Sequence, residues 1–233
     1  MVKHSKKVSI LMSTFNSEKY VSRSIEGILQ QKYNDFELLI VDDNSSDNTY
    51  GVIKSYSDKN ENIRVFKNNL NLGLTKSLNF LISHSTGDFI ARQDDDDISF
   101  PNRIQKQVSE LEKLNLDFCT TRAVEINTKR KIPGISYYLP TNLLLKFKNP
   151  FIHGTLLIKK EVLETLGGYD ENFYYSQDLK LVLDLIKRGY KYKIINEVLY
   201  SLNLTNNISK NKFTQQKYYA NCARKNIKPD LFL

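Results

Sequence analysis

Apolar residues in the first hundred positions fall into short runs, which are typical of buried strands, separated by stretches of helical spacing. The predicted strands are residues 8–15, 36–41, 63–66 and 88–92. Between the first two runs, Val21, Ile25 and Ile28 recur at the spacing of one helix face. Similar spacing predicts helices in residues 47–56 and 75–85. This alternation indicates an α/β fold with a parallel sheet and helices on both faces.

The second half of the chain has a less regular pattern. The predicted elements are a helix beginning at Pro101, strands at 117–126 and 154–158, a helix ending at Leu166 and a helix at 177–188. The buried stripe of the last helix is predicted to be Leu179, Val182, Leu183 and Ile186. Residues 129–148 show little periodicity, and we expect them to form a loop over the active face.

Length and charge narrow the class of protein. A chain of 233 residues is long enough for one α/β domain. Its net charge of +8 arises in residues 187–230, which hold ten basic and two acidic residues. This basic C-terminus predicts either a solvated terminal helix or contact with an anionic membrane surface.

Membrane-spanning and secretory patterns are absent from the sequence. We find no run of 18 apolar residues and no signal-peptide pattern, so we expect a cytoplasmic protein, with peripheral contact at the inner face of the membrane as an extension of that hypothesis. Cys119 and Cys222 lie far apart without metal-ligand spacing. They are expected to be free thiols.

The most informative motif is the run of four aspartates at residues 94–97, directly after the fourth predicted strand. Two like charges ~4 Å apart repel by about 1 kcal/mol in water and by about 4 kcal/mol at an effective dielectric of 20. A divalent cation would relieve this repulsion, and side chains that alternate along an extended chain let one pair share an ion. Oxygen ligands favour Mg²⁺ or Mn²⁺. The alternative is a solvated acidic turn.

The context of this run favours the metal site. In open parallel sheets, ligands bind beyond the carboxyl ends of the strands. Polar clusters follow three of the predicted strands, at residues 13–16, 42–46 and 94–97. We therefore expect all three clusters to line one crevice.

In their order and spacing, these motifs resemble the family 2 glycosyltransferases, which are inverting, nucleotide-sugar-dependent enzymes with the GT-A fold. The segments that carry the resemblance are 8–16, 41–47, 71–74, 91–98, 167–170 and 176–178. The resemblance implies one catalytic domain over residues 1–200, with a Rossmann-like, mostly parallel sheet flanked by helices. Residues 1–97 would form its nucleotide-binding half and residues 98–200 its acceptor-binding half, followed by a basic tail at 201–233.

The same resemblance implies a set of donor-binding residues in the first half. Ser13, Phe15 and Asn16 are expected to line the nucleotide pocket. Asp43 is expected to accept a hydrogen bond from the base, as is usual for uracil, and Asp42 to shape the pocket.

In the acidic run, the resemblance implies that Asp94 and Asp95 meet the donor and that Asp96 binds Mn²⁺ or Mg²⁺. The register of the family's metal motif is ambiguous because all four positions are aspartate. Asp96 belongs to both plausible alignments, which is why it is the predicted metal ligand.

Asp178 matches the family's catalytic base, although a helix cap is the simpler interpretation of this residue alone. The preceding family glutamate is Gln177 here, a departure that leaves Asp178 in place but removes a neighbouring negative charge. Two basic residues frequent in the family are missing, at Leu78 and in residues 200–204, so the metal would offset most of the phosphate charge. His153 is expected beside the acceptor, as a sugar contact or as a structural histidine.

The resemblance implies transfer of a sugar from a nucleotide diphosphate sugar, UDP-linked by expectation, to a hydroxyl of a glycan or lipid-linked glycan. The setting would be bacterial surface polysaccharide or lipooligosaccharide assembly. A metal-dependent nucleotidyltransferase is an alternative, but it normally needs a glycine-rich loop that residues 13–17 lack. The second alternative is a non-catalytic module that binds nucleotides or nucleic acid. An acidic crevice suits a nucleic-acid backbone poorly, so we expect no nucleic-acid partner.

Overall fold

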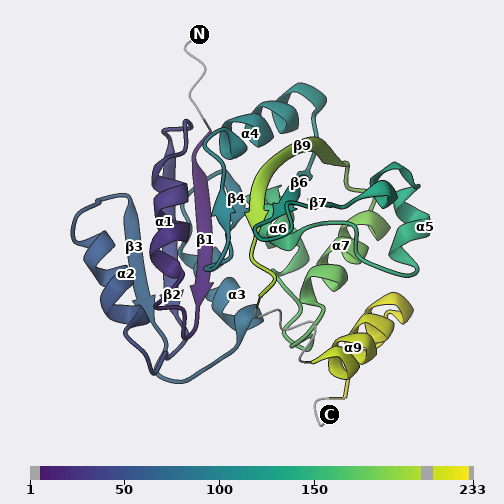
Figure 1. Ribbon diagram of the computed structural model, residues 1–233. Helices are drawn as coiled ribbons and strands as arrows, with labels where there is room; N and C mark the ends of the chain where they lie inside the picture. The colour runs from purple at the N-terminus through teal and green to yellow at the C-terminus, as the bar shows by residue number, and fades with distance from the viewer. Residues whose placement is uncertain (1–5, 206–211, 231–233) are drawn as a thin grey trace.

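A curled sheet runs through the molecule and separates two layers of helices (Figure 1). The structure is a computed structural model, which describes residues 6–205 and 212–230. The strands are β1 (Val8–Thr14), β2 (Phe36–Asp42), β3 (Ile63–Lys67), β4 (Phe89–Arg92), β5 (Ile98–Ser99), β6 (Phe118–Glu125), β7 (Lys131–Ile132), β8 (Leu157–Lys159) and β9 (Tyr192–Leu202). They follow the order β3-β2-β1-β4-β8-β6-β9-β5, and β7 pairs with β6.

The helices lie on the two faces of this sheet. The α-helices are α1 (Val21–Leu29), α2 (Thr49–Ser57), α3 (Leu74–His84), α4 (Arg103–Leu114), α5 (Thr141–Leu145), α6 (Lys160–Leu166), α7 (Gln177–Lys187) and α9 (Phe213–Lys225). Two short 3₁₀ helices are η1 (Ile135–Tyr138) and η2 (His153–Thr155). In the part of the chain that is described, no helix is long and apolar enough to cross a membrane.

The first four strands pair in parallel, with β1 between β2 and β4. The apolar runs of β1, β2 and β4 are buried on both faces because helices cover each side, whereas β3 at the edge is mostly only partly buried. On β1, Leu11 points into one core, while Ile10 and Met12 point into the other. The parallel register brings the carboxyl ends of β1, β2 and β4 to one edge, which fixes where their polar loops meet.

The sheet beyond β4 is mostly antiparallel. Strand β8 pairs antiparallel with β4 and β6. Among the described strands of this part, only β6 and β9 pair in parallel, with a register shift near Arg122. Helix α9 packs on α7 and buries Tyr219, Cys222 and Ala223. Both cysteines are free and buried, as predicted.

Three details of the second half differ from the sequence predictions. Residues 154–158 are not one strand, because the Thr155 hydroxyl donates to Ile152 O (2.8 Å) and holds a 3₁₀ turn before β8 begins. Residues 129–148 are not simply a loop, since they contain β7, η1 and α5.

The buried stripe of α7 is also shifted from the predicted one. Leu179 and Val182 are buried as expected, but Leu183 and Ile186 are only partly buried. Leu181 and Leu185 take the buried positions, and α7 also contacts α9. The predicted domain boundary at residue 200 falls inside β9.

Candidate active site

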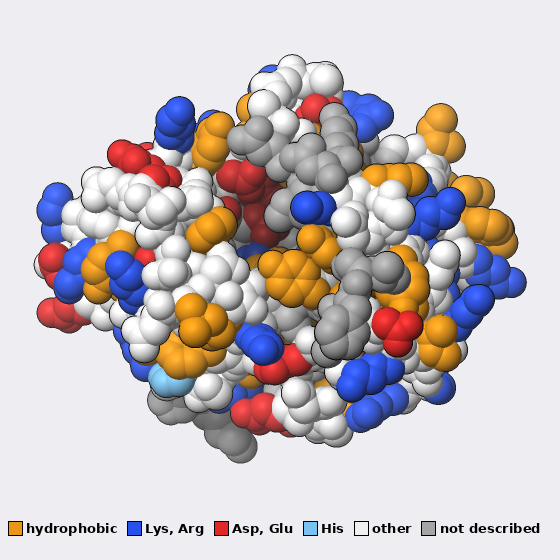
Figure 2. Space-filling model, turned by 90° about the horizontal axis from the view of Figure 1, so that it is seen from below, with side chains coloured by type: hydrophobic (Ala, Val, Ile, Leu, Met, Phe, Trp, Pro, Cys, Tyr) orange, Lys and Arg blue, Asp and Glu red, His pale blue; other side chains and the backbone are white. Residues whose placement is uncertain are grey.

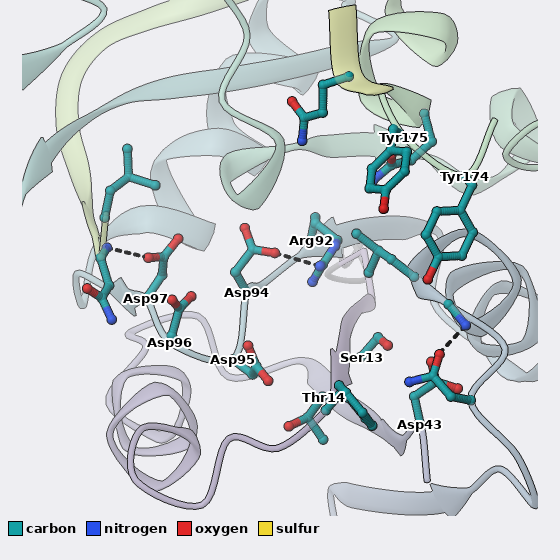
Figure 3. Close-up of a pocket in the computed structure, with 18 of the residues that line it drawn as sticks. Ser13, Thr14, Asp43, Arg92, Asp94, Asp95, Asp96, Asp97, Tyr174 and Tyr175 are labelled. Carbon is teal, nitrogen blue, oxygen red and sulfur yellow. Dashed lines mark hydrogen bonds and ion pairs between the residues drawn. The ribbon is translucent and has the colours of Figure 1, made fainter. Parts of the chain in front are cut away.

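A cavity of about 480 Å³ opens at the carboxyl ends of β1, β2 and β4. Figure 2 shows acidic side chains in a hollow of this face, and Figure 3 shows the residues around the cavity. Six of the predicted site residues line it: Ser13, Phe15, Asp43, Asp94, Asp95 and Asp96. The structure therefore brings together the three polar clusters that follow separate strands.

Three predicted site residues do not line this cavity. Asn16 has a positive φ of 51°, and its side-chain carbonyl accepts the Ser46 N–H (2.8 Å), so this residue joins two loops instead of facing the cavity. Asp42 is fully buried under the loop and accepts the Ser45 N–H (3.3 Å). Asp178 lies on α7, next to the cavity-lining Gln177.

Asp43 is the anchor of one cavity wall. Its carboxylate accepts hydrogen bonds from Asn68 Nδ2 (2.7 Å), Leu72 N (2.8 Å) and Gly73 N (2.8 Å). Gly73 has a φ of 81°, which other residues adopt only with strain, and this conformation aims its N–H at the carboxylate. A carboxylate has about four lone-pair sites, so Asp43 keeps capacity for one more donor on this wall.

Arg92 holds the first member of the acidic run. Its guanidinium is 3% exposed and contacts Asp94 Oδ1 at 2.6 Å, while the Asp94 backbone N–H donates to Tyr200 Oη (3.1 Å). Gly154 lies against the same carboxylate: a Cβ there would be 2.5 Å from Asp94 Oδ2 and from Tyr200 Oη. Asp94 is thus fixed from three sides.

The remaining members of the run repel one another. Burial raises the pKa of Asp96 to about 7, and the charges of Asp94 and Asp95 add to this effect. Burial, reinforced by the neighbouring Asp94, also raises the pKa of Asp95. Asp97 is buried, and its carboxylate accepts the Asn203 N–H (2.6 Å) at the end of β9. The cavity therefore contains more negative charge than Arg92 neutralises.

A divalent cation fits this arrangement. Among the described residues, no group of three His, Cys, Asp or Glu side chains converges as a ready metal cage. The carboxylates instead face an open cavity, which suits Mg²⁺ or Mn²⁺ that takes the rest of its ligands from water and phosphate. Asp96, partly exposed and with a raised pKa, is the carboxylate that such an ion would relieve most.

Asp178 belongs to a second polar group beside the cavity. Its Oδ2 accepts a hydrogen bond from Asn149 Nδ2 (2.8 Å), and His153 Nε2 lies 2.8 Å from Tyr169 Oη. Burial lowers the pKa of His153, and the Arg92 charge acts in the same direction. His153 shares a hydrogen bond with Tyr169, and Asn149 fixes the orientation of the Asp178 carboxylate.

Sequence reasoning missed several cavity residues. Arg92 was predictable, because a basic residue at a strand end close to four aspartates is expected to pair with one of them. Tyr174 and Tyr175 form the opposite wall (Figure 3), but nothing in their spacing points there. Gln216 on α9 also lines the cavity, and it could not be placed without the packing of α9 on α7.

Comparisons with known proteins identify the family of this chain. A family model described as Glycosyl transferase family 2 matches residues 9–167. EpsE of Bacillus subtilis is 34% identical over 205 residues, which cover 84% of this chain and 72% of EpsE. WfgD of Escherichia coli, named as a UDP-Glc:alpha-D-GlcNAc-diphosphoundecaprenol beta-1,3-glucosyltransferase, is 38% identical over 77% of this chain and 70% of its own length.

Solved structures share the fold. The mannosyltransferase PcManGT of Pyrobaculum calidifontis, solved in complex with GDP-Man and Mn²⁺, superimposes with a TM-score of 0.78 at 19% identity. The match covers 98% of this chain and 66% of that chain. The fold is that of a GT-A glycosyltransferase, as the motifs predicted. The chain belongs to glycosyl transferase family 2.

Proposed function

We propose that the protein transfers a sugar from a UDP-linked donor to an acceptor hydroxyl, with inversion at the anomeric carbon. The observation that carries this proposal is one cavity that joins Ser13, Phe15 and Asp43 to the acidic run, with Asp178 beside it. The name of WfgD includes a UDP-Glc donor, which supports a uridine nucleotide here. The proposed acceptor is a glycan or lipid-linked glycan of bacterial surface polysaccharide assembly.

The donor nucleotide would lie against the wall formed by Ser13, Phe15 and Asp43. Phe15 is 48% exposed, so its ring is available for stacking on a base. The spare acceptor capacity of Asp43 would take an N–H of uracil. Asn16 and Asp42 act indirectly, because they fix the loops from which these three side chains project.

The diphosphate would lie at the acidic run. Asp96 is the proposed ligand of Mn²⁺ or Mg²⁺, with Asp94 and Asp95 beside it and toward the donor. When bound, such an ion offsets the negative charge that develops on the leaving diphosphate. Arg92 would share that task, since it lines the same cavity and is the cation already paired with Asp94.

Asp178 is the proposed base. The attacking hydroxyl must lose its proton, and a positioned carboxylate assists such a transfer by typically ~10²- to 10⁴-fold. Asn149 donates to Oδ2 and leaves Oδ1 for the acceptor. Asp178 lies in the first turn of α7, next to the cavity-lining Gln177.

The test is a panel of nucleotide sugars incubated with the protein and Mn²⁺, with release of the free nucleoside diphosphate as the measurement. We expect release from UDP-sugars, with water as the acceptor, and an inverted anomeric configuration in the freed sugar, read by NMR before its anomers interconvert. Retention of configuration would contradict a single displacement assisted by Asp178. Release of pyrophosphate from a nucleoside triphosphate would instead support a nucleotidyltransferase.

A further inference from the structure

Residues 129–148 display an unusual group of exposed apolar side chains. Among the described residues, eleven large apolar side chains are exposed, and five of them lie between Ile135 and Phe147. Their exposed fractions are 89% for Ile135, 73% for Tyr138, 49% for Leu139, 46% for Leu143 and 76% for Phe147. A concentration of this kind marks an interaction surface, because isolated exposed apolar residues are normally scattered.

The segment that carries these exposed side chains is fixed by tertiary contacts and is not a loosely packed loop. Leu144 and Leu145 are 7% and 5% exposed and anchor α5 in the core. Tyr137 Oη donates to Ile194 O (3.2 Å), and Lys148 Nζ donates to Ser136 Oγ (2.7 Å). The segment is therefore fixed from beneath while its other side chains point outward.

The same segment is strongly cationic. Residues 126–160 contain no Asp or Glu, and the apolar positions are flanked along the chain by five exposed basic residues, Lys129, Arg130, Lys131, Lys146 and Lys148. Within the described ranges none of these five forms an ion pair, whereas several other lysines of the molecule do. Figure 2 shows orange and blue side chains gathered along the right-hand side, where Figure 1 places α5.

Helix α9 extends this cationic surface. Arg224 Nε donates to Leu145 O (2.9 Å), which joins α9 to α5. Lys217, Lys225 and Lys228 are exposed on or just after α9. One side of α9 is already packed through Tyr219 and Cys222, while Phe213 and Ile227 are exposed at its two ends. The helix therefore contributes charge and two further apolar side chains.

We infer that residues 129–148, flanked by α9, bind the surface of an anionic phospholipid bilayer. Basic side chains that form no ion pair within the described ranges can pair with lipid phosphates, and the apolar side chains can enter the boundary between headgroups and acyl chains. Tyr138 and Phe147 supply the aromatic rings that favour this boundary. The segment leads directly into Asn149, which holds Asp178, so the bilayer lies on the side of the proposed base.

The test is sedimentation of the whole protein with vesicles. Wild-type protein is expected to sediment with vesicles of phosphatidylglycerol and phosphatidylcholine in equal parts, and not with phosphatidylcholine alone. The double variant Ile135→Ser with Phe147→Ser should bind at least about tenfold more weakly, because both anchors are removed. The pair Lys131→Gln with Lys146→Gln should weaken binding and reduce its sensitivity to salt.

Matched controls test whether vesicle binding depends on this surface or on exposed apolar and basic side chains in general. Leu114→Ser removes an exposed apolar side chain from α4, and Lys59→Gln with Lys113→Gln removes two exposed lysines elsewhere. Both controls should bind vesicles like the wild type. Circular dichroism of each variant confirms that the fold is retained, which is expected because every altered side chain is exposed.

Two results would overturn the inference. One is wild-type protein that ignores both vesicle types, or that binds equally well after the Ile135 and Phe147 substitutions. The other is a concentration-dependent dimer, seen by analytical ultracentrifugation and abolished by these substitutions, which would make the surface a contact between copies. Neither result bears on sugar transfer, because the assay contains no donor and no acceptor.

Discussion

The halves of the molecule before and after residue 97 differ in regularity and in what they expose. The first half pairs its strands in parallel and, of the exposed large apolar side chains described, contains only Phe15 and Leu70. The second half mixes strand directions and contains the other nine. The parallel half therefore presents its polar loops at one fixed edge, whereas the mixed half exposes apolar side chains whose positions local patterns do not predict.

The largest effect should come from the second half, at Asp178. Asp178→Asn keeps the hydrogen-bonding shape but cannot take a proton, so the transfer rate should fall by about 10²- to 10⁴-fold. Binding of UDP with Mn²⁺, measured by calorimetry, should stay within about twofold of the wild type. Asp184→Asn on the same helix, where Asp184 pairs with Lys180, is the control and should keep its activity. Full turnover by Asp178→Asn would refute the assignment of the base.

The second largest effect tests whether Leu144 anchors α5 beneath the exposed apolar side chains of residues 135–147. Leu144→Ala removes a buried anchor of α5 and should lower the free energy of unfolding by about 3 kcal/mol. Leu143→Ala, at an exposed neighbour, should change it by less than about 0.5 kcal/mol. Urea denaturation measures both. Equal effects would mean that α5 is not anchored as described.

A third change addresses the first half at Arg92. Arg92→Met leaves the Asp94 carboxylate without its cation and should lower the free energy of unfolding by about 2 kcal/mol. It should also weaken UDP binding, because one positive charge leaves the cavity. Arg64→Met is a suitable control, since Arg64 pairs with Glu37 on a partly exposed site away from the cavity. Unchanged UDP affinity in Arg92→Met would remove Arg92 from the donor site.

The smallest effect is a pH dependence at Asp96. Because its pKa is raised to about 7, Asp96 is mostly protonated at pH 6 and mostly charged at pH 8. A metal ion must displace that proton, so Mn²⁺ affinity should be about tenfold weaker at pH 6 than at pH 8. Metal-free protein should show the opposite trend in stability: the raised pKa favours the folded state at low pH, and this contribution is lost as pH rises through about 7. Asp96→Asn should flatten both curves, as measured by calorimetry and thermal unfolding, and unchanged curves would contradict the role of Asp96.

The sequence was sufficient to predict those parts of the fold whose geometry follows from local residue patterns. Apolar runs and helical spacing predicted β1 to β4, and parallel pairing then brought Ser13, Asp43 and Asp96 to one edge. The position of the cavity was thus predictable from the first hundred residues.

The remainder depended on contacts between distant segments. Gln216 reaches the cavity only because α9 packs on α7, and no spacing in residues 213–225 encodes that choice. Asn16 was predicted to face the nucleotide, but its side chain bonds to Ser46, thirty positions away. The short elements between Lys131 and Leu145 are held by tertiary contacts such as that of Tyr137, which have no periodic signature.

Gly154 has a consequence for mutational tolerance. A methyl group at this position would collide with both Asp94 and Tyr200, and neither can retreat, since Arg92 grips one and the other is fully buried. A randomised library at residue 154, selected for stable folding, should therefore return almost only glycine, which makes this position a sensitive gauge of how tightly the acidic loop is seated.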